Sequence, residues 1–300
     1  MADYQLPPWQ FETGHQMEVA EVGELSYLYF PAFRAYPKLR HGFSTRQGGV
    51  SEDYLGTMNF SFDRGDDPEH VRENYRRMAA ALGVSYDSLT VAKQTHTTNI
   101  REITMAERGA GVRFPRPYDN VDGIMTNVPG ITLVTYHADC LPLYLYDPAH
   151  QAVALLHAGW RGTVDRIALC GLEKMQEAYG TRPSDVIAGI GPGISAACYE
   201  TSEAVRIQFA ATFPERDIEK IFTAPHTGED GARHWQLDLA LANRLLLEHA
   251  GVQDIFDSGV CTYRNAKRLF SHRAQGPKRG LNAAFIGIAD SVSPRPGETR

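Results

Sequence analysis

The chain reads TYHADCLPLYLYDPAHQAVALLHAGWRGT from Thr135 to Thr163. Apolar runs in and just before this segment have the length and the branched or aromatic composition of short β-strands. Cys140 and His157 each stand where such a run meets a loop, and His96 ends an earlier run in the same way. Zinc binds thiolate and imidazole, and three such ligands with one open position are typical of catalytic rather than structural sites. The segment therefore indicates an enzyme.

The geometry of a strand suggests how these side chains could meet. Successive side chains point to opposite faces, so Cys140 shares a face with Val134 and Tyr136, and His157 with the apolar residues before it. If the two runs pair, Cys140 and His157 meet at one edge of a sheet. His137 is a further candidate ligand or proton carrier, but alternation directs it to the other face. The alternative is that Cys140 is a buried apolar side chain and the histidines are ordinary core or loop residues, because ligands so far apart lack the local spacing of specific metal motifs.

Length and composition limit the classes of protein to be considered. The 300 residues allow one large domain or two small ones, and 43% hydrophobic with 22% charged residues is the balance of a soluble globular protein. A net charge of −6 disfavours nucleic acid as the main partner. We find no signal-peptide pattern, no run that could span a bilayer and only four scattered cysteines. These features predict a cytoplasmic, reduced protein without a membrane partner.

Periodicity and breakers predict the elements. Strands come in groups with helices set between them, which favours an α+β fold over a doubly wound sheet, and no domain boundary stands out. We expect surface loops at Phe114–Pro117 and Ala224–Arg233, and a disordered tail over residues 291–300. The expected strands are Leu25–Phe30, His41–Ser44, Thr90–Ala92, Gly123–Thr126, Thr132–Tyr136, Leu143–Tyr146, Ala152–Leu156, Val186–Ile190, Gly259–Thr262 and Asn282–Ile288. The expected helices are Pro68–Leu82, Val164–Tyr179, Glu203–Phe213 and Leu237–His249.

Several loops carry groups that can bind an anion. Residues 44–49 follow a strand and supply the Ser44 hydroxyl, the Arg46 guanidinium and flexible backbone, which suits a phosphate, although a hairpin turn with an exposed arginine fits equally. Arg161 leads into a helix whose N-terminus favours anions, or it is only a loop charge. Arg273 is a candidate for the rim of the site, or lies at a strand end in solvent. Residues 189–193 lack the third glycine of a dinucleotide loop and the lysine of a P-loop.

Seven motifs in order resemble one family. They are His41-Gly42-Phe43-Ser44-Thr45-Arg46 with Gly48-Gly49-Val50-Ser51; Gln94-Thr95-His96; Asp122-Gly123; Ala138-Asp139-Cys140 with Pro142; His157 to Thr163; Gly191-Pro192 and Ile194 with Cys198-Tyr199-Glu200; and Cys261-Thr262 with Phe270-Ser271 and Arg273. From about His41 to Ile288 the chain resembles the YfiH-like or laccase-domain family, long labelled polyphenol oxidase. It departs at His137, where members often have Thr or a small residue, and at His272-Arg273-Ala274, where they often have Tyr-Arg-Arg.

The resemblance implies a fold and an activity. The fold is a single α/β/β/α layered domain with mixed sheets, here over residues 1–290. A zinc ion is held by His96, Cys140 and His157. The implied substrates are purine nucleosides and inorganic phosphate: members phosphorolyse adenosine, inosine, guanosine and methylthioadenosine, and deaminate adenosine. Arg46 falls in the loop expected to hold phosphate.

A zinc ion with an open position can activate water for attack on the purine C6. Base deaminases of this kind use a non-ligand carboxylate to carry protons, and Asp139 is our candidate for that role beside the catalytic Cys140 and His157. Phosphorolysis depends mainly on positioning and charge stabilisation, for which Arg46, with Arg161, is the predicted phosphate holder.

Two other enzymes remain as alternatives. A copper-dependent phenol oxidase needs histidines at paired spacing, and the eleven histidines here include no HxH pair, so we predict that any bound copper is adventitious. A metal-free cysteine hydrolase would use Cys140 as nucleophile with His157 or His96 as base. A third alternative is a non-catalytic accessory protein. This alternative does not explain why a thiol, imidazoles and a guanidinium would converge.

Overall fold

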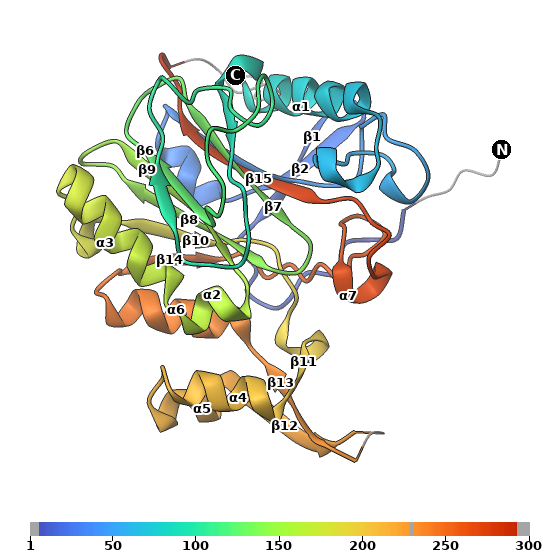
Figure 1. Ribbon diagram of the computed structural model, residues 1–300, viewed down its shortest axis with the longest axis vertical. Coiled ribbons are helices and arrows are strands. Elements are labelled where there is room, and N and C mark those ends of the chain that lie inside the picture. The colour runs from blue at the N-terminus through green and yellow to red at the C-terminus, as the bar shows by residue number, and fades with distance from the viewer. Residues whose placement is uncertain (1–5, 229–230, 293–300) are drawn as a thin grey trace.

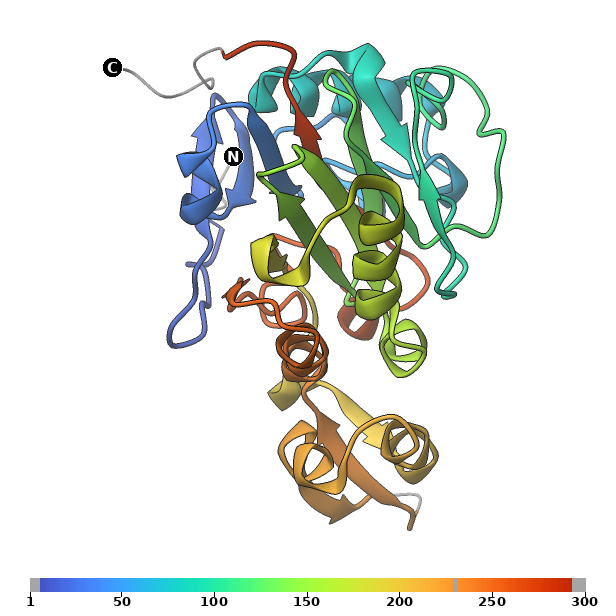
Figure 2. The same cartoon turned by 90° about the vertical axis from the view of Figure 1, so that its left-hand side faces the viewer.

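Two six-stranded mixed sheets pack face to face in the computed structural model, and helices cover both outer faces (Figures 1 and 2). The structure describes residues 6–228 and 231–292. An apolar layer lies between the sheets, and each helical layer has its own apolar cluster against the outer face of one sheet. This arrangement confirms the predicted α+β class and the α/β/β/α layering. Most of the predicted tail, residues 293–300, lies outside the described residues.

The first sheet is covered by helix α1 (Pro68–Leu82). Asp67 caps this helix by accepting a hydrogen bond from the Glu69 N–H, and Gly83 ends it with a φ of 67°, so the helix has its predicted bounds. Only the pairing of β4 with β7 is parallel. The strand order is β1 (Glu18–Val22), β2 (Leu25–Tyr29), β3 (Leu39–Ser44), β15 (Asn282–Ile288), β7 (Thr132–His137) and β4 (Leu89–Val91).

The second sheet is covered by helices α3 (Ile167–Tyr179) and α6 (Leu239–His249). Its two central strands, β8 and β9, are buried along their whole length, as expected for strands covered on both faces. The strand order is β14 (Asp254–Asp257), β10 (Ile187–Ile190), β8 (Leu141–Asp147), β9 (Ala152–Ala158), β6 (Gly123–Thr126) and β5 (Ile100–Glu102).

A smaller unit projects from the end of this body (Figures 1 and 2). It is a three-stranded sheet of β11 (Glu200–Ser202), β13 (Arg233–Leu237) and β12 (Phe222–Thr227), with helices α4 (Glu203–Ala210) and α5 (Glu215–Ile221). The predicted loop Ala224–Arg233 is therefore wrong in part, because its first residues belong to β12 and its last begins β13. Five of the six residues of β12 are exposed, so the strand lacks the apolar alternation that a sequence pattern can detect.

Three other predicted elements differ from the structure by more than two residues. The helix predicted at Val164–Tyr179 is split into α2 (Trp160–Val164) and α3, because Arg166 adopts a left-handed conformation with φ 62°. The helix predicted at Glu203–Phe213 ends at Ala210. The strand predicted at Gly259–Thr262 is wrong: this stretch forms only isolated bridges, and the strand of this region is β14, which pairs in parallel with β10.

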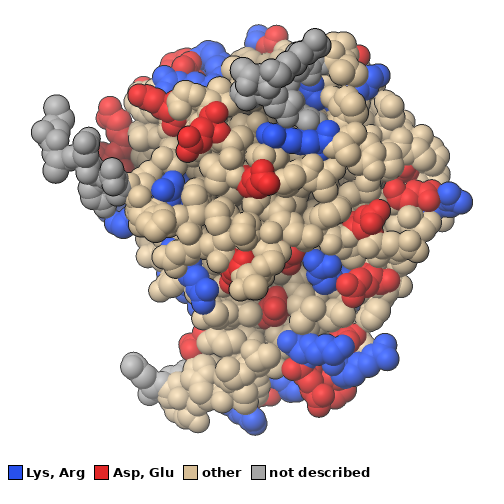
Figure 3. Space-filling view, turned by 180° about the vertical axis from the view of Figure 1, so that it is seen from behind, with Lys and Arg blue, Asp and Glu red and all other residues tan. Residues whose placement is uncertain are grey.

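The remaining elements are short. They are helix α7 (His272–Gln275) and 3-10 helices at Pro31–Ala35, Asp53–Leu55, Phe62–Arg64, Tyr86–Ser88, Pro183–Asp185 and Ala196–Cys198. Among the described residues, every helix is too short or too polar to cross a membrane. On the face opposite to that of Figure 1, basic and acidic side chains are interspersed rather than gathered into a patch of one sign (Figure 3).

Candidate metal centre

Three side chains from distant parts of the chain converge at one end of the sheets. Ligand atoms of His96, Cys140 and His157 all lie within 4.8 Å of one another. The Cys140 Sγ is 4.0 Å from the His96 Nε2, and the rings of His96 and His157 meet edge to face with centroids 4.9 Å apart. His157 is buried, Cys140 is partly buried and His96 is exposed, so the cluster is open to solvent on one side.

The two sheets bring Cys140 and His157 together in a way that the sequence did not predict. Strand β7 lies in the first sheet and β9 in the second, so these two runs do not pair. Residues 138–140 instead carry the chain from one sheet to the other. Cys140 immediately precedes β8, which pairs antiparallel with β9 and places Pro142 opposite His157. The site therefore lies where the chain changes sheets.

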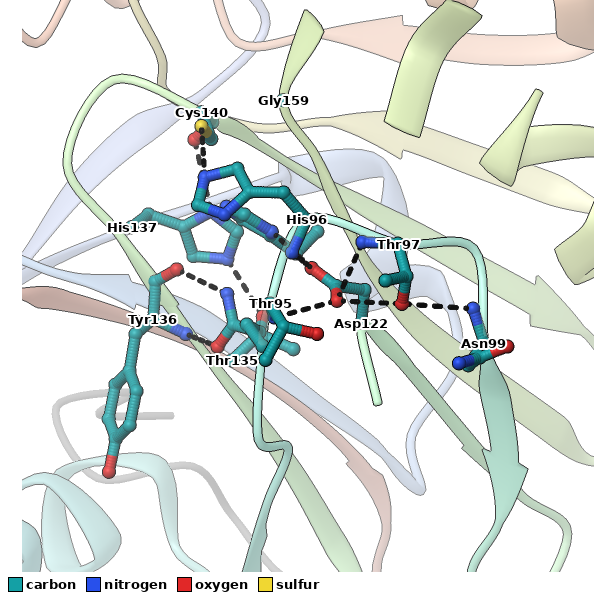
Figure 4. Close-up of polar contacts among 12 residues, drawn as sticks. Thr95, His96, Thr97, Asn99, Asp122, Thr135, Tyr136, His137, Cys140 and Gly159 are labelled. Carbon is teal, nitrogen blue, oxygen red and sulfur yellow. Dashed lines mark hydrogen bonds and ion pairs between the residues drawn. The ribbon is translucent and has the colours of Figure 1, made fainter. Parts of the chain in front are cut away.

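Asp122 holds two of the candidate ligands in place (Figure 4). Its Oδ1 accepts hydrogen bonds from the His96 backbone N–H at 3.0 Å and from the His157 Nδ1 at 2.8 Å. Its Oδ2 accepts from the backbone N–H groups of Thr95 at 2.8 Å and Thr97 at 3.0 Å. With Nδ1 engaged, the Nε2 of His157 is the atom left for a metal, which is how a carboxylate behind a ligand histidine commonly acts.

The charge state of Asp122 follows from these donors. Burial raises the pKa of its carboxyl, but the hydrogen bonds from His157 and from the Thr97 and Thr95 backbone more than offset this and lower the pKa to about 2. Asp122 is fully buried and charged. The sequence marked it only as part of the Asp122-Gly123 motif, without a role.

The thiol and the buried imidazole shift each other's proton affinity. Burial raises the pKa of Cys140, but His157 and His96 lower it to about 6. Burial lowers the pKa of His157, but Cys140 and Asp122 raise it to about 9. Both shifts favour the thiolate of Cys140 beside the imidazolium of His157. The thiolate is the form of cysteine that binds a metal.

His137 lies next to this cluster but outside the set of converging ligand atoms. Both ring nitrogens are engaged: Nε2 lies 2.7 Å from the Thr135 Oγ1 and Nδ1 lies 3.0 Å from the Cys140 carbonyl oxygen. Burial, with a smaller contribution from His157, holds the pKa of His137 well below its ordinary value. The neutral ring of His137 therefore helps to hold the backbone at Cys140 in place.

Asp139 is tied to the C-terminal part of the chain. One carboxylate oxygen accepts from the Thr262 hydroxyl at 2.6 Å, and the other accepts from the Arg273 backbone N–H at 2.6 Å. Its backbone is left-handed, with φ 93°, at the turn between the two sheets. These contacts position the turn that carries Cys140. The role of Asp139 as a proton carrier stays a prediction.

The predicted phosphate loop faces another part of the surface. The Arg46 guanidinium donates to the carbonyl oxygens of Gly56 at 3.1 Å and Ala266 at 2.9 Å, and its carbon lies 4.5 Å from the centre of the Phe270 ring. The Ser44 hydroxyl is buried and accepts from the Ala283 N–H. Neither residue lines the pocket at the metal cluster, so their phosphate role stays a prediction.

Arg161 and Arg273 also point elsewhere. Arg161 is exposed and stacks on the Trp160 ring, 4.4 Å from its centre. The Arg273 guanidinium donates to the Glu200 carbonyl oxygen at 3.0 Å and lies over the Tyr199 ring. Their assignment to substrate binding stays a prediction as well.

A pocket of about 270 Å³ opens beside His96, Cys140 and His157. One wall is held by Gln94, whose side-chain amide exchanges two hydrogen bonds of 2.7 Å with the backbone of Tyr136, which is labelled in Figure 4. Four basic residues line this pocket, namely Arg64, Lys93, Arg116 and Arg279. No sequence pattern marked these four residues, because they stand in separate segments without a shared motif.

The comparisons with known proteins agree with this fold and site. A family model described as multi-copper polyphenol oxidoreductase laccase matches residues 40–289. The chain belongs to this family. The resemblance to the YfiH-like family predicted from the motifs is thereby confirmed, since solved structures of YfiH and YlmD share the fold.

Similar proteins carry a different functional name from that of the family. A protein of Deinococcus radiodurans named purine nucleoside phosphorylase is 38% identical over 249 residues, 83% of this chain and 88% of that protein. Purine nucleoside phosphorylase YlmD of Bacillus subtilis is 34% identical over 253 residues, with the same coverage of both chains. The crystal structure of YlmD from Geobacillus stearothermophilus matches with a TM-score of 0.81 and 31% identity, covering 91% of this chain and 99% of that one.

Gly159 offers a test of how closely the three ligands are packed. A Cβ at Gly159 would lie 3.0 Å from the Cys140 Sγ and 3.2 Å from the His96 Cδ2, whereas its φ of −82° and ψ of 174° suit any residue. We expect Gly159→Ala to weaken zinc binding about tenfold, since overpacking at the candidate ligands costs about 1–3 kcal/mol. Competition with a chromophoric chelator measures the affinity.

Gly162→Ala is the matched control for this experiment. A Cβ at Gly162 has its nearest neighbours at 3.5 Å, an ordinary contact, so zinc affinity should stay within about twofold of the unaltered chain. Equal zinc affinity in the Gly159→Ala chain would show that the ligands are not held as closely as the structure has them.

Proposed function

We propose that this chain is a zinc-dependent purine nucleoside phosphorylase. Its proposed substrates are adenosine, inosine, guanosine and methylthioadenosine with inorganic phosphate, and it is also proposed to deaminate adenosine. The observation that carries the proposal is the convergence of His96, Cys140 and His157, supported by Asp122, in a pocket lined by basic side chains. The names of the relatives favour purine nucleosides as the substrates.

The chemistry of the ligand set fits zinc. One sulfur and two ring nitrogens are borderline-soft donors, and only these three converge among the described residues, which matches the three protein ligands of catalytic zinc. A zinc ion at this position supplies Lewis acidity and lowers the pKa of a bound water. The buried Asp122 carboxylate fixes the orientation of His157 and the backbone at His96.

The reactions set requirements that the pocket can meet. In phosphorolysis the bond between C1′ and the purine nitrogen breaks, a bond from C1′ to a phosphate oxygen forms, and the base leaves with the electron pair and takes up a proton. Basic side chains in the pocket stabilise the phosphate and hold it near C1′. In deamination, water replaces the amino group at C6 and ammonia leaves. Asp139 is the proposed proton carrier in this site.

Incubation of the purified, metal-analysed chain with adenosine, with and without phosphate, tests the proposal. We expect about one zinc per chain, adenine and ribose-1-phosphate only when phosphate is present, and inosine with ammonia in either case. A zinc-replete chain that forms none of these products would refute the proposal. Stoichiometric copper together with turnover of phenols would favour the oxidase of the family name instead.

The thiolate–imidazolium pair favours one second candidate, a metal-free cysteine hydrolase. The lowered pKa of Cys140 beside His157 is what a cysteine nucleophile with its base requires. A covalent adduct on Cys140 in an active preparation without metal would support this candidate. Loss of all activity on removal of zinc, with recovery when zinc is added back, would exclude it.

A further inference from the structure

Two arginines in the metal pocket lack the partners that charged groups normally have. Arg279 is 8% exposed, its Nη1 donates to the Gly276 carbonyl oxygen at 3.2 Å, and its buried Nε has no hydrogen-bond partner among the described residues. Arg64 lines the same pocket, and within residues 6–228 and 231–292 its guanidinium forms no ion pair. Two guanidiniums that line one pocket without a carboxylate partner among the described residues favour an anionic ligand there.

The backbone segments that carry these arginines are fastened together by one side chain. Asn59 is fully buried, and its Oδ1 accepts from the backbone N–H groups of Ser61 at 3.1 Å and of Leu281 at 3.0 Å. Ser61 precedes the 3-10 helix that ends in Arg64, and Leu281 lies two residues after Arg279. The two guanidiniums are therefore placed by a rigid contact between distant segments and not by a flexible loop.

Like charges in this position repel each other. Burial lowers the pKa of Arg279, and the neighbouring Arg64 lowers it further, whereas Asp139 and Cys140 act in the opposite direction. The other two cations of the pocket already have partners: Lys93 lies 3.5 Å from an Asp63 carboxylate oxygen, and Arg116 donates to the Ala92 carbonyl oxygen. An anion between Arg64 and Arg279 would remove this repulsion.

We propose that Arg64 and Arg279 form an oxyanion subsite that holds inorganic phosphate beside the metal position. The planar fork of a guanidinium matches two oxygens of a phosphate, and both forks line the same pocket of about 270 Å³ as the three candidate metal ligands. The inference rests on the proposed function, which supplies phosphate as the second substrate. It places the phosphate on residues other than Arg46, whose guanidinium is bonded to two backbone carbonyls in a different pocket.

Binding measurements without nucleoside test the subsite directly. We expect Arg64→Gln and Arg279→Gln each to weaken binding of inorganic phosphate to the zinc-loaded chain by tenfold or more in calorimetry, with zinc content unchanged. Phosphate should raise the melting temperature of the unaltered chain and not of these variants, since only a chain that binds phosphate is stabilised by it. Arg108→Gln is the control, because Arg108 donates to the Gly130 carbonyl oxygen away from the pocket.

Kinetics and a second ligand separate the possible outcomes. We expect KM for phosphate to rise tenfold or more in both variants, KM for the nucleoside to change less than threefold, and Arg279→Lys to recover part of the loss. Phosphate affinity that falls only in Arg46→Gln would overturn the inference. The inference would also be overturned if the variants no longer bound adenosine 5′-monophosphate but still bound inorganic phosphate. The subsite would then bind the phosphate group of a nucleotide substrate.

Failure of the inference and failure of the proposed function give different results. A chain that phosphorolyses nucleosides while Arg64→Gln and Arg279→Gln leave phosphate binding intact refutes the subsite alone. A chain that binds phosphate through these arginines but forms no ribose-1-phosphate refutes the phosphorylase and leaves the subsite standing.

Discussion

Replacing Cys140 with serine should remove zinc from the purified chain and lower phosphorolysis by roughly 10³-fold. Cys140 is one of three converging candidate ligands, and structural zinc sites bind with an apparent free energy on the order of 10–16 kcal/mol. If one ligand carries about a third of such an energy, its loss costs about 3–5 kcal/mol, or roughly 10²–10⁴ in affinity. Elemental analysis after dialysis and product formation from inosine with phosphate measure the two effects.

Cys170→Ser is the control for Cys140→Ser. Cys170 lies on α3, partly buried, and burial raises the pKa of its thiol, so it has neither the position nor the ionisation of a ligand. This variant should keep its zinc and its rate. A Cys140→Ser chain with one zinc ion and the full rate would show that the cluster is not the centre of the reaction.

The convergence of the three candidate ligands could be predicted because each stands at a local pattern in the sequence. Short apolar runs end at His96, Cys140 and His157, and strand ends gather where a sheet meets its loops. Helix α1 could be predicted for the same reason, since the capping residue Asp67 and the terminating residue Gly83 directly flank the helix in the sequence.

The remaining parts of the site depend on contacts between distant segments. Asp122 precedes β6, and it reaches His157 only because β6 pairs with β9 in the second sheet. Arg64 and Arg279 are joined through Asn59, a residue that no pattern singles out. The change of sheet after β7 was also missed. The alternation of side chains along a strand indicates the face on which each residue lies, but it does not indicate which sheet the strand joins.

Strand β12 shows a related limit. Its exposed polar residues pair with β13 through the backbone, so hydrogen bonding rather than an apolar face defines it. Polar runs of this kind are indistinguishable from loops by composition. Of the unit formed by β11, β12 and β13 with α4 and α5, only α4 was therefore predicted.

Asp122→Asn should weaken zinc binding by about 10–100-fold even though Asp122 is not itself a ligand. The carboxylate accepts from both His96 and His157 and from the Thr95 and Thr97 backbone. An asparagine keeps one acceptor oxygen and turns an NH₂ group toward donors that it cannot satisfy, so the loop at His96 and the ring of His157 lose their common anchor. Activity lost at low zinc should return when zinc is added, which activity titrations against free zinc can follow.

Asp147→Asn separates this effect from a general loss of stability. Asp147 is also fully buried, accepts from the backbone N–H groups of Ala149 and His150, and binds the His150 Nδ1 at 2.7 Å, but it lies at the far end of the β8–β9 hairpin. Both variants should unfold at lower denaturant concentration, because each leaves buried donors without an acceptor, at about 1–3 kcal/mol. Only Asp122→Asn should change the zinc affinity. If the two variants bind zinc equally well, Asp122 contributes to the fold and not to the metal centre.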